Sequence, residues 1–277
     1  MIDLHCHLLP GIDDGAKDID ASLAMARMAS TDGITVTACT PHILPGVYDN
    51  SGPAIRTALE RLRDALAQAG IELQLVSGAD VHVAPDLIAR LRDGRALTLN
   101  DTRYFLLEPP HHVLPPRLED HIFGLQAAGY VPILTHPERL TWLDSHYGLI
   151  KRLVYNNVLM QLTAGSVMGR FGRRPRYWAD RMLDDGLCHL MASDAHNAKQ
   201  RAPRLSDARE VIARRLGDAQ AAMLFVTRPQ AILNNEGTAE LALARRAKQA
   251  ASGRLPAHGA STWSKLLKKV RRAGEVE

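Results

Sequence analysis

Two histidines lie two residues apart near the start of the chain, in the run I-D-L-H-C-H at residues 2–7. Residues two apart in a strand point to the same side, so the imidazoles of His5 and His7 can bind one metal ion together. Asp13 and Asp14 follow a Pro-Gly turn and offer carboxylate oxygens, which are hard ligands. Paired strand histidines are also common as ordinary surface residues, so a metal site requires further ligands from the rest of the chain.

Residues 2–7 alternate between apolar and polar side chains, which predicts a strand. In a regular strand Ile2, Leu4 and Cys6 share one face. Cys6 is therefore expected in the core, on the face opposite the two histidines.

Seven strand-like runs recur along the chain, and six of them end on a His, Asp or Glu. The loops at the carboxyl ends of parallel barrel strands meet at one end of the barrel, so these side chains are expected to lie together. Imidazole and carboxylate are ligands of Zn, Mn and Fe, so a site for several metal ions is predicted. The residues in these positions are His5, His7, Asp13 or Asp14, His42, Asp80, Glu108, His136, Asp194 and His196.

Helical segments separate these runs, and the alternation predicts parallel βαβ units in an α/β fold with a barrel-like sheet. An open doubly wound sheet is the alternative. No strand is followed by a dinucleotide fingerprint or a P-loop. The strands are expected at residues 2–7, 34–39, 73–76, 104–107, 131–134, 158–162 and 187–192, and the helices at 21–29, 53–69, 84–91, 115–128, 145–154, 175–185, 204–216 and 229–235.

Two arginines, Arg139 and Arg201, follow His136 and His196 closely in the sequence. A guanidinium is a planar fork that matches phosphate oxygens, so the pair suits an anionic substrate. His82 is a weaker alternative to Asp80. His111 and His112, in a Pro-rich loop after Glu108, are expected as exposed loop residues, and a position at the mouth of the site is the alternative.

The net charge of +4 is distributed unevenly. Residues 237–277 carry nine Lys or Arg and three Glu, whereas residues 1–236 carry 25 basic and 27 acidic residues. A near-neutral body is not that of a nucleic-acid binder. The three cysteines lie in apolar runs and indicate reduced thiols, and no signal peptide or membrane span is evident, so a cytoplasmic location is expected.

With these residues located, the chain resembles the PHP (polymerase and histidinol phosphatase) superfamily. Within it, the chain is similar to the manganese-dependent protein-tyrosine phosphatases encoded with capsule and exopolysaccharide genes. The matching stretches run in order along residues 1 to about 235. They are M-I-D-L-H-C-H-L-L-P-G-I-D-D-G at 1–15, T-P-H at 40–42, S-G-A-D at 77–80, N-D-T-R-Y-F-L-L-E at 100–108, T-H-P-E-R at 135–139, A-S-D-A-H-N at 192–197 and L-F-V-T-R-P-Q-A-I at 224–232.

The resemblance implies a distorted (βα)7 TIM-like barrel, with two or three Mn²⁺ ions at the C-terminal ends of the strands, although Fe, Zn, Co or Mg are alternatives. Asp13 would support the turn rather than bind metal. The family usually has Glu at position 80, so the shorter Asp80 puts the metal bridge in doubt. The implied ligand groups are His5, His7 and Asp194 for one ion, with Asp80 bridging to a second; Glu108 and His136 for that second ion; and Asp14, His42 and His196 for a third.

The implied activity is that of a phosphoric monoester hydrolase acting on phosphotyrosine, with Arg139 and Arg201 as phosphate ligands and His136 beside them in the catalytic site. The implied substrate is a membrane-bound tyrosine autokinase that controls capsule or exopolysaccharide synthesis. A cysteine-dependent route needs Arg six residues after the nucleophile, but Ile12, Pro45 and Asp194 occupy those positions. The alternatives are a small-molecule phosphatase of the histidinol-phosphate type, another PHP phosphoesterase, and a metal-stabilised scaffold.

The basic segment 237–277 is predicted to be a separate extension of the phosphatase domain, residues 1–236. Its stretch 261–272 carries Trp263, Leu266, Leu267 and Val270 on one helical face, with basic residues around them. That pattern suits an anionic membrane surface or an acidic partner. A disordered tail, or a helix packed on the barrel, is the alternative.

Overall fold

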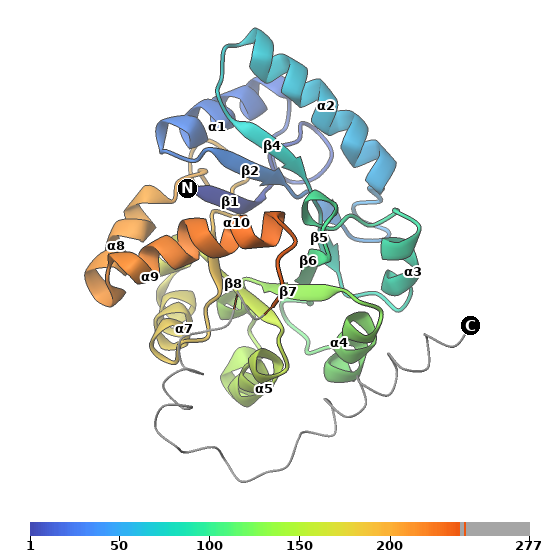
Figure 1. The fold of residues 1–277 in the computed structure, drawn as a ribbon, viewed down its shortest axis with the longest axis vertical. Helices are drawn as coiled ribbons and strands as arrows, with labels where there is room; N and C mark the ends of the chain where they lie inside the picture. Colours follow the sequence, from blue (N-terminus) through green and yellow to red (C-terminus); the bar gives the residue numbers. More distant parts are fainter. Residues whose placement is uncertain (239–240, 242–277) are drawn as a thin grey trace.

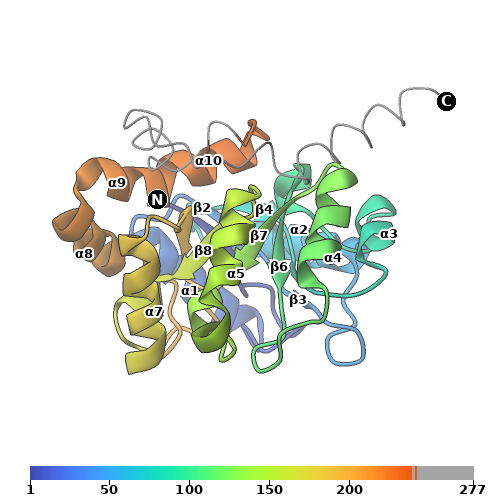
Figure 2. The ribbon, with the colours of Figure 1, turned by 90° about the horizontal axis from the view of Figure 1, so that it is seen from below.

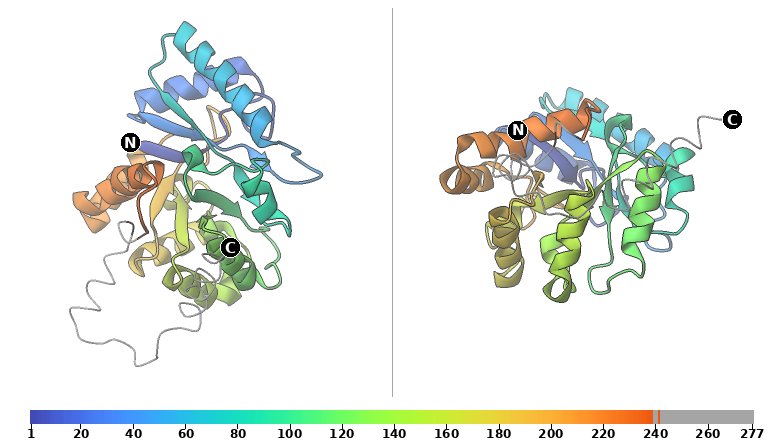
Figure 3. Two further views of the ribbon diagram at one scale, coloured as in Figure 1. Left: turned by 45° about the vertical axis from the view of Figure 1, so that its right-hand side comes forward. Right: turned by 60° about the horizontal axis from the view of Figure 1, so that its bottom comes forward.

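The computed structural model describes residues 1–238 and Leu241, which form one layer of strands surrounded by helices (Figures 1 and 3). The strands are β1 (Ile2–Cys6), β2 (Val36–Cys39), β3 (His42–Ile43), β4 (Gln74–Ser77), β5 (Asp80–His82), β6 (Tyr104–Glu108), β7 (Val131–Thr135), β8 (Leu159–Thr163) and β9 (Leu190–Ala192). The α-helices are α1 (Ile19–Thr31), α2 (Gly52–Gln68), α3 (Leu87–Arg92), α4 (Leu118–Ala127), α5 (Leu143–Tyr155), α6 (Ala164–Val167), α7 (Arg173–Asp184), α8 (Ser206–Leu216), α9 (Asp218–Ala222) and α10 (Arg228–Leu233).

All strand pairs in the described residues are parallel, in the orders β1-β2-β4 and β3-β5-β6-β7-β8-β9. Strands β3 and β5 continue β2 and β4 after short bends, so two of the seven predicted strands are split. The chain after β9 returns to β1: the Asp194 N–H donates to the His5 carbonyl at 2.9 Å, and the His7 N–H to the Ala195 carbonyl at 2.9 Å. The strands therefore follow one another in a distorted seven-membered ring, and the predicted barrel-like α/β fold is confirmed.

The helices lie where the hydrophobic periodicity predicts them, within a few residues at each end. In α2, Ile55, Leu59, Leu62 and Leu66 recur at helical spacing and are all buried. The Asp18 side chain caps α1 by accepting the Ala21 N–H at 2.8 Å. Only short elements were not predicted, namely α6, α9, the 3₁₀ turns Leu99–Asp101 and Pro137–Arg139, and a π-helical turn at Met223–Thr227.

Two apolar cores lie on the two faces of the strands. The outer core fills the space between strands and helices and includes Phe105 and Leu107 of β6, while the inner core contains Tyr104 and Leu106 of the same strand. The last helix, α10, contributes Ile232 and its neighbours to the inner core. Figure 2 shows α10 across the end of the barrel at which the strands begin, so the opposite end remains for the site.

The inward-facing register of the strands places polar side chains directly beyond the inner core. Val76 and Leu106 are inner-core residues. Glu108 occupies the next inward position of β6, two residues after Leu106, and Asp80 comes four residues after Val76, past the bend. Most of the strands thus begin with an apolar layer and lead to a ligand-type residue, whereas β8 ends on Thr163.

Strand β1 departs from the predicted alternation. Its register against β2 moves from Asp3–Thr37 to Cys6–Cys39, so β1 carries one extra residue there, which is a β-bulge. Leu4 consequently packs in the inner core and Cys6 in the outer core. The expectation that both share one face is wrong, because the bulge shifts the alternation, whereas the expected burial of Cys6 is confirmed.

No helix within the described part of the chain is long and apolar enough to cross a membrane. The predicted helical face with Trp263, Leu266, Leu267 and Val270 lies outside the described residues. So does the rest of segment 237–277, apart from residues 237–238 and Leu241.

Candidate metal centre

The nine predicted ligands all lie at the barrel end where the strands finish, and they form overlapping groups of nitrogen and oxygen atoms within 4.8 Å of one another. Eight of the nine are buried or nearly so, and Asp14 is about half exposed. The groups are His5, His7 and Asp80; His5, His136 and Asp194; His42, His82 and Glu108; Glu108, His111 and His136; and His7, Asp14, His42 and His196.

The innermost group surrounds His5 and His7. Their Nε2 atoms lie 3.1 Å apart, and the His5 Nε2 atom lies 3.4 Å from Asp80 Oδ2 and 3.5 Å from Asp194 Oδ1. The His7 Nε2 atom is also 3.5 Å from Asp194 Oδ1. Two imidazoles and two carboxylates from three strand ends therefore surround one small volume.

A second group surrounds Glu108 at the end of β6. Its Oε1 atom lies 3.5 Å from His136 Nε2 and 3.1 Å from His111 Nε2, and its Oε2 atom contacts His82 and lies 3.3 Å from His42 Nδ1. His111 is thus part of the site, so the expectation of an exposed loop residue is wrong for it, and the alternative position at the site is the one observed. The loop after β6 folds back over its own strand end.

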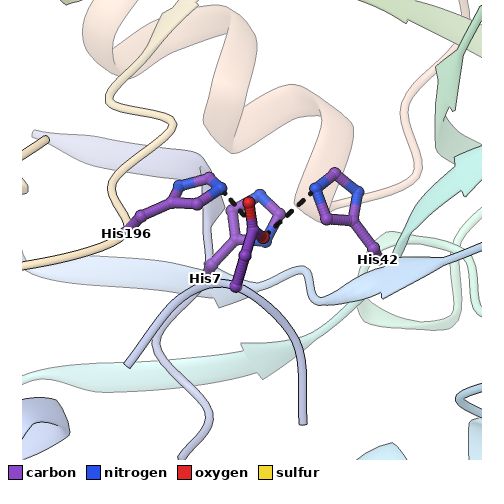
Figure 4. A group of neighbouring side chains, drawn as sticks. His7, His42 and His196 are labelled. Atoms are coloured by element: carbon purple, nitrogen blue, oxygen red, sulfur yellow. Dashed lines mark ion pairs between the residues drawn. The ribbon is translucent and has the colours of Figure 1, made fainter. Parts of the chain in front are cut away.

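The third group lies nearest the surface. Figure 4 shows the rings of His7, His42 and His196 turned toward one another around a carboxylate. This carboxylate is Asp14, whose Oδ1 atom lies 3.5 Å from His42 Nε2 and 3.3 Å from His196 Nε2. The ring centroids of His7 and His196 are 3.9 Å apart.

Asp80 lies between the groups in spite of its short side chain. Its Oδ2 atom is 3.4 Å from His5 Nε2 and 3.6 Å from His42 Nδ1. No group within 4.8 Å contains Asp80 together with Glu108 or His136. The carboxylate thus reaches nitrogen ligands on both sides, but it faces His42 rather than His136.

Hydrogen bonds fix the orientation of three histidines. The Nδ1–H of His5 donates to Gln161 Oε1 at 2.8 Å, and that of His7 donates to Asp13 Oδ2 at 2.7 Å. The Nδ1–H of His196 donates to the carbonyl of Asp194 at 3.1 Å. Each bond leaves Nε2 directed into the site, which is the usual arrangement around metal-binding histidines.

Gln161 had no signal in the sequence, because only the register of β8 turns it inward. Asp13 has the supporting role expected of it, since its Oδ1 atom also accepts the Gly15 N–H at 2.9 Å.

The acidic groups control the charge of the site. Burial by itself would lower the pKa of His5, but Asp80 and Asp194 outweigh it and raise that pKa to about 9. Burial also opposes the charged form of Glu108, yet contacts with histidines hold its pKa well below its usual range. The cluster consequently keeps carboxylates ionised and attracts cations.

The donor set fits divalent metal ions. Asp80 is fully buried, and neither of its oxygens has a hydrogen-bond partner. A buried carboxylate without partners is strongly destabilising, whereas a metal ion compensates its charge. Mixed imidazole and carboxylate donors are typical of Zn, Mn and Fe sites and do not by themselves select one metal.

The two predicted arginines converge on one atom. Arg139, from the turn after β7, and Arg201, from the loop after β9, both donate to Asp194 Oδ2, with a distance of 2.6 Å for Arg201. The guanidinium of Arg139 also stacks over Phe171 at 4.6 Å, and that of Arg201 lies 5.9 Å from the same ring. An anionic oxygen at the edge of the metal cluster can therefore accept from both guanidinium groups.

Comparisons with known proteins agree with this site. Residues 1–234 match the family model "Capsular polysaccharide synthesis, CpsB/CapC". The chain is 37% identical over 224 residues to tyrosine-protein phosphatase YwqE of Bacillus subtilis, covering 81% of this chain and 88% of YwqE. It is 31% identical to the putative tyrosine-protein phosphatase CapC of Staphylococcus aureus, over 73% of this chain and 79% of CapC.

Among solved structures, the chain is similar to one from a study of YwqE from Bacillus subtilis and CpsB from Streptococcus pneumoniae, described there as unique metal-dependent tyrosine phosphatases. The TM-score is 0.82 at 35% identity, over 86% of this chain and 96% of the solved chain. The family match spans the barrel and every residue of the metal cluster. The chain therefore belongs to the CpsB/CapC family of capsular polysaccharide synthesis proteins.

Proposed function

We propose that this protein is a metal-dependent protein-tyrosine phosphatase, a phosphoric monoester hydrolase that uses Mn²⁺. The observation that carries the proposal is the convergence of Arg139 and Arg201 on one carboxylate oxygen beside the histidine and carboxylate cluster. Asp194 Oδ2 occupies a position in which a phosphoryl oxygen would find two charge-assisted donors. The relatives named as tyrosine phosphatases support the same substrate.

Different residues of the chain would bind the metal ions and the phosphoryl group. The nine predicted ligands would hold the ions, which when bound lower the pKa of an attacking water and neutralise phosphoryl charge. Arg139 and Arg201 would bind and orient the phosphoryl oxygens, with His136 beside them. A phenolate leaving group, with a pKa near 10, needs little protonation, so a strong general acid is not required.

The cysteines support a thiol-independent reaction. Cys6, Cys39 and Cys188 are buried, and burial raises the pKa of Cys39 and of Cys188 to about 12. Burial also raises the pKa of Cys6 well above its usual value. Since the thiolate is the nucleophilic form, none of these thiols is available at neutral pH.

The proposed substrate is a phosphotyrosine protein of a capsule or exopolysaccharide locus, namely a membrane-bound tyrosine autokinase. The family match to capsular polysaccharide synthesis supports this assignment. The proposed location is the cytoplasm.

Metal removal tests the proposal. We expect EDTA to abolish p-nitrophenyl phosphate turnover, Mn²⁺ to restore it, and iodoacetamide to leave it unchanged, because the nucleophile is not a thiol. Full activity in chelator would refute the metal dependence. Comparison of kcat/KM for a phosphotyrosine peptide and for histidinol phosphate tests the substrate, and a higher value for histidinol phosphate would favour a small-molecule phosphatase.

A further inference from the structure

A small hollow adjoins the arginine pair, on the side of the loops after β8 and β9. Ser193 lines it and precedes Asp194, on which both arginines converge. The other lining residues are neutral or basic and include Gly165, Arg170, Phe171, Arg201 and Arg204.

The hollow shares two residues with the proposed phosphoryl site. Phe171 packs against both guanidinium groups, and Arg201 belongs to both places. A Cβ atom on Gly165 would lie 2.7 Å from Phe171 Cε2, so the ring packs directly against the glycine backbone. A group bound in the hollow would therefore lie beside a phosphoryl group held by the arginines.

The charges around the hollow are not balanced. Arg170 pairs with Asp207 at 3.1 Å, and Arg201 pairs with Asp194. Arg204 has no ion-pair partner among the described residues. In addition, the Nε–H of Arg201 is buried without an acceptor. Arg204, an uncompensated cation, thus lines the hollow, and Arg201, which also lines it, has one donor without an acceptor.

We propose that this hollow is a second anion subsite, which binds the carboxylate of an Asp or Glu residue close to the phosphotyrosine of the substrate. The inference rests on the proposed function and specifies its substrate as an acidic phosphotyrosine segment. A phosphoryl group would use the same chemistry. A carboxylate is the better match, because Arg204 contributes a single unpaired charge and a carboxylate carries one negative charge.

Matched peptides test the subsite. We would measure kcat/KM with Mn²⁺ for phosphotyrosine peptides that carry Glu or Gln at each position within three residues of the phosphotyrosine. The wild-type protein is expected to prefer Glu about tenfold at one or more positions, through charge-assisted hydrogen bonds. The Arg204→Gln variant should reduce that preference to less than about twofold.

Arg61→Gln is the matched control, because Arg61 is an exposed arginine on α2 with no ion pair to any other residue that the structure describes. It should retain the wild-type preference. Both variants should turn over p-nitrophenyl phosphate like the wild type, since that substrate has no flanking residue.

Equal rates for Glu and Gln peptides, or a preference that survives unchanged in Arg204→Gln, would overturn the subsite. A peptide with a second phosphorylated residue that exceeds every Glu peptide would overturn the assignment to a carboxylate. If the wild-type protein turned over neither the phosphotyrosine peptides nor p-nitrophenyl phosphate, the proposed function itself would be refuted. Failure of the subsite and failure of the proposed function are therefore distinguishable.

Discussion

At the residue scale, Gln161 illustrates how a neutral side chain affects metal binding. It accepts the Nδ1–H of His5 at 2.8 Å and so directs Nε2 into the cluster. Replacing Gln161 by Met removes this acceptor, and loss of such a partner lowers metal affinity about 10- to 100-fold. We therefore expect the Mn²⁺ concentration for half-maximal p-nitrophenyl phosphate turnover to rise by that factor.

Two controls accompany the Gln161 variant. Gln161→Glu keeps an acceptor and should restore Mn²⁺ affinity. Gln126→Met changes a glutamine on α4 whose side-chain amide donates to the carbonyl of Asn156 and not to a residue of the metal cluster, so it should have no effect. An unchanged Mn²⁺ requirement in Gln161→Met would show that His5 does not need this partner.

His189 predicts a pH dependence of stability. It is buried, its Nδ1 accepts the Met160 N–H at 3.0 Å, and burial lowers its pKa to about 3. The unfolded chain binds this proton near pH 6.5, so the stability contribution is present above pH 6.5 and is lost as the pH falls toward 3. Each pH unit in that window removes about 1.4 kcal/mol from the free energy of unfolding.

Urea unfolding at pH 7.5 and 5.5 checks this expectation, with His189→Asn as the reference because Asn can still accept the Met160 N–H without titrating. The wild type should lose about 1.4 kcal/mol more than the variant between these pH values. Taking the difference cancels the titration of the other histidines. Equal losses would mean that His189 does not resist protonation.

The ligand residues could be predicted from the sequence, whereas the residues that orient them could not. His42 and Glu108 are recognisable because six of the seven strand-like runs end on a His, Asp or Glu, and the ends of parallel strands meet at one end of a barrel. Gln161 lies inside β8 and His189 directly precedes β9, and only the register decides that the first faces the site and the second does not. His111 was misjudged because a Pro-rich loop gives no indication that it folds back over its own strand.

At the element scale, the turn after β7 depends on a buried carboxylate. Glu138 is fully buried, and its Oε1 accepts the Thr163 N–H from the end of β8 at 2.9 Å. This bond holds the turn between His136, which has a left-handed φ of 33°, and Arg139. Glu138→Ala should lower kcat for p-nitrophenyl phosphate about 10- to 100-fold, because small displacements of catalytic groups are costly.

Glu138→Gln retains the accepting oxygen but removes the carboxylate charge. It should keep most of the activity, which would show that Glu138 acts by holding the turn in position and not by its charge. The Mn²⁺ requirement should change less than kcat in Glu138→Ala, since Arg139 is the more displaced group. An alanine variant with normal kcat would contradict the role of this bond.

The bends within strands were beyond sequence analysis for a related reason. Hydrophobic periodicity identifies a run of strand residues but not a one-residue shift in its pairing. At Gly78, between β4 and β5, an added Cβ would lie 2.9 Å from both the Leu99 and Thr40 side chains, so the backbone approaches its neighbours closely there. The split between β4 and β5 thus coincides with a close tertiary contact that the sequence pattern does not reveal.

At the scale of the whole molecule, the barrel is closed by its own C-terminal elements. Ile232 of α10 fills the inner core, and the Tyr104 hydroxyl donates to the carbonyl of Glu236. Leu241 is also buried in the inner core. The alternation of strands and helices predicted this architecture, but not that α10 and Leu241 close the end opposite the metal cluster.

The basic C-terminal segment can be separated from the barrel by a cut placed after Leu241, so that this buried side chain is retained. We expect the shortened protein to keep the thermal midpoint and the p-nitrophenyl phosphate kcat/KM of the full chain, because the described cores and the metal cluster stay complete. Co-sedimentation with anionic liposomes should fall, because the removed residues carry the excess of Lys and Arg. Equal sedimentation of both forms would exclude membrane binding by this segment, while a lower thermal midpoint would show that residues beyond Leu241 support the barrel.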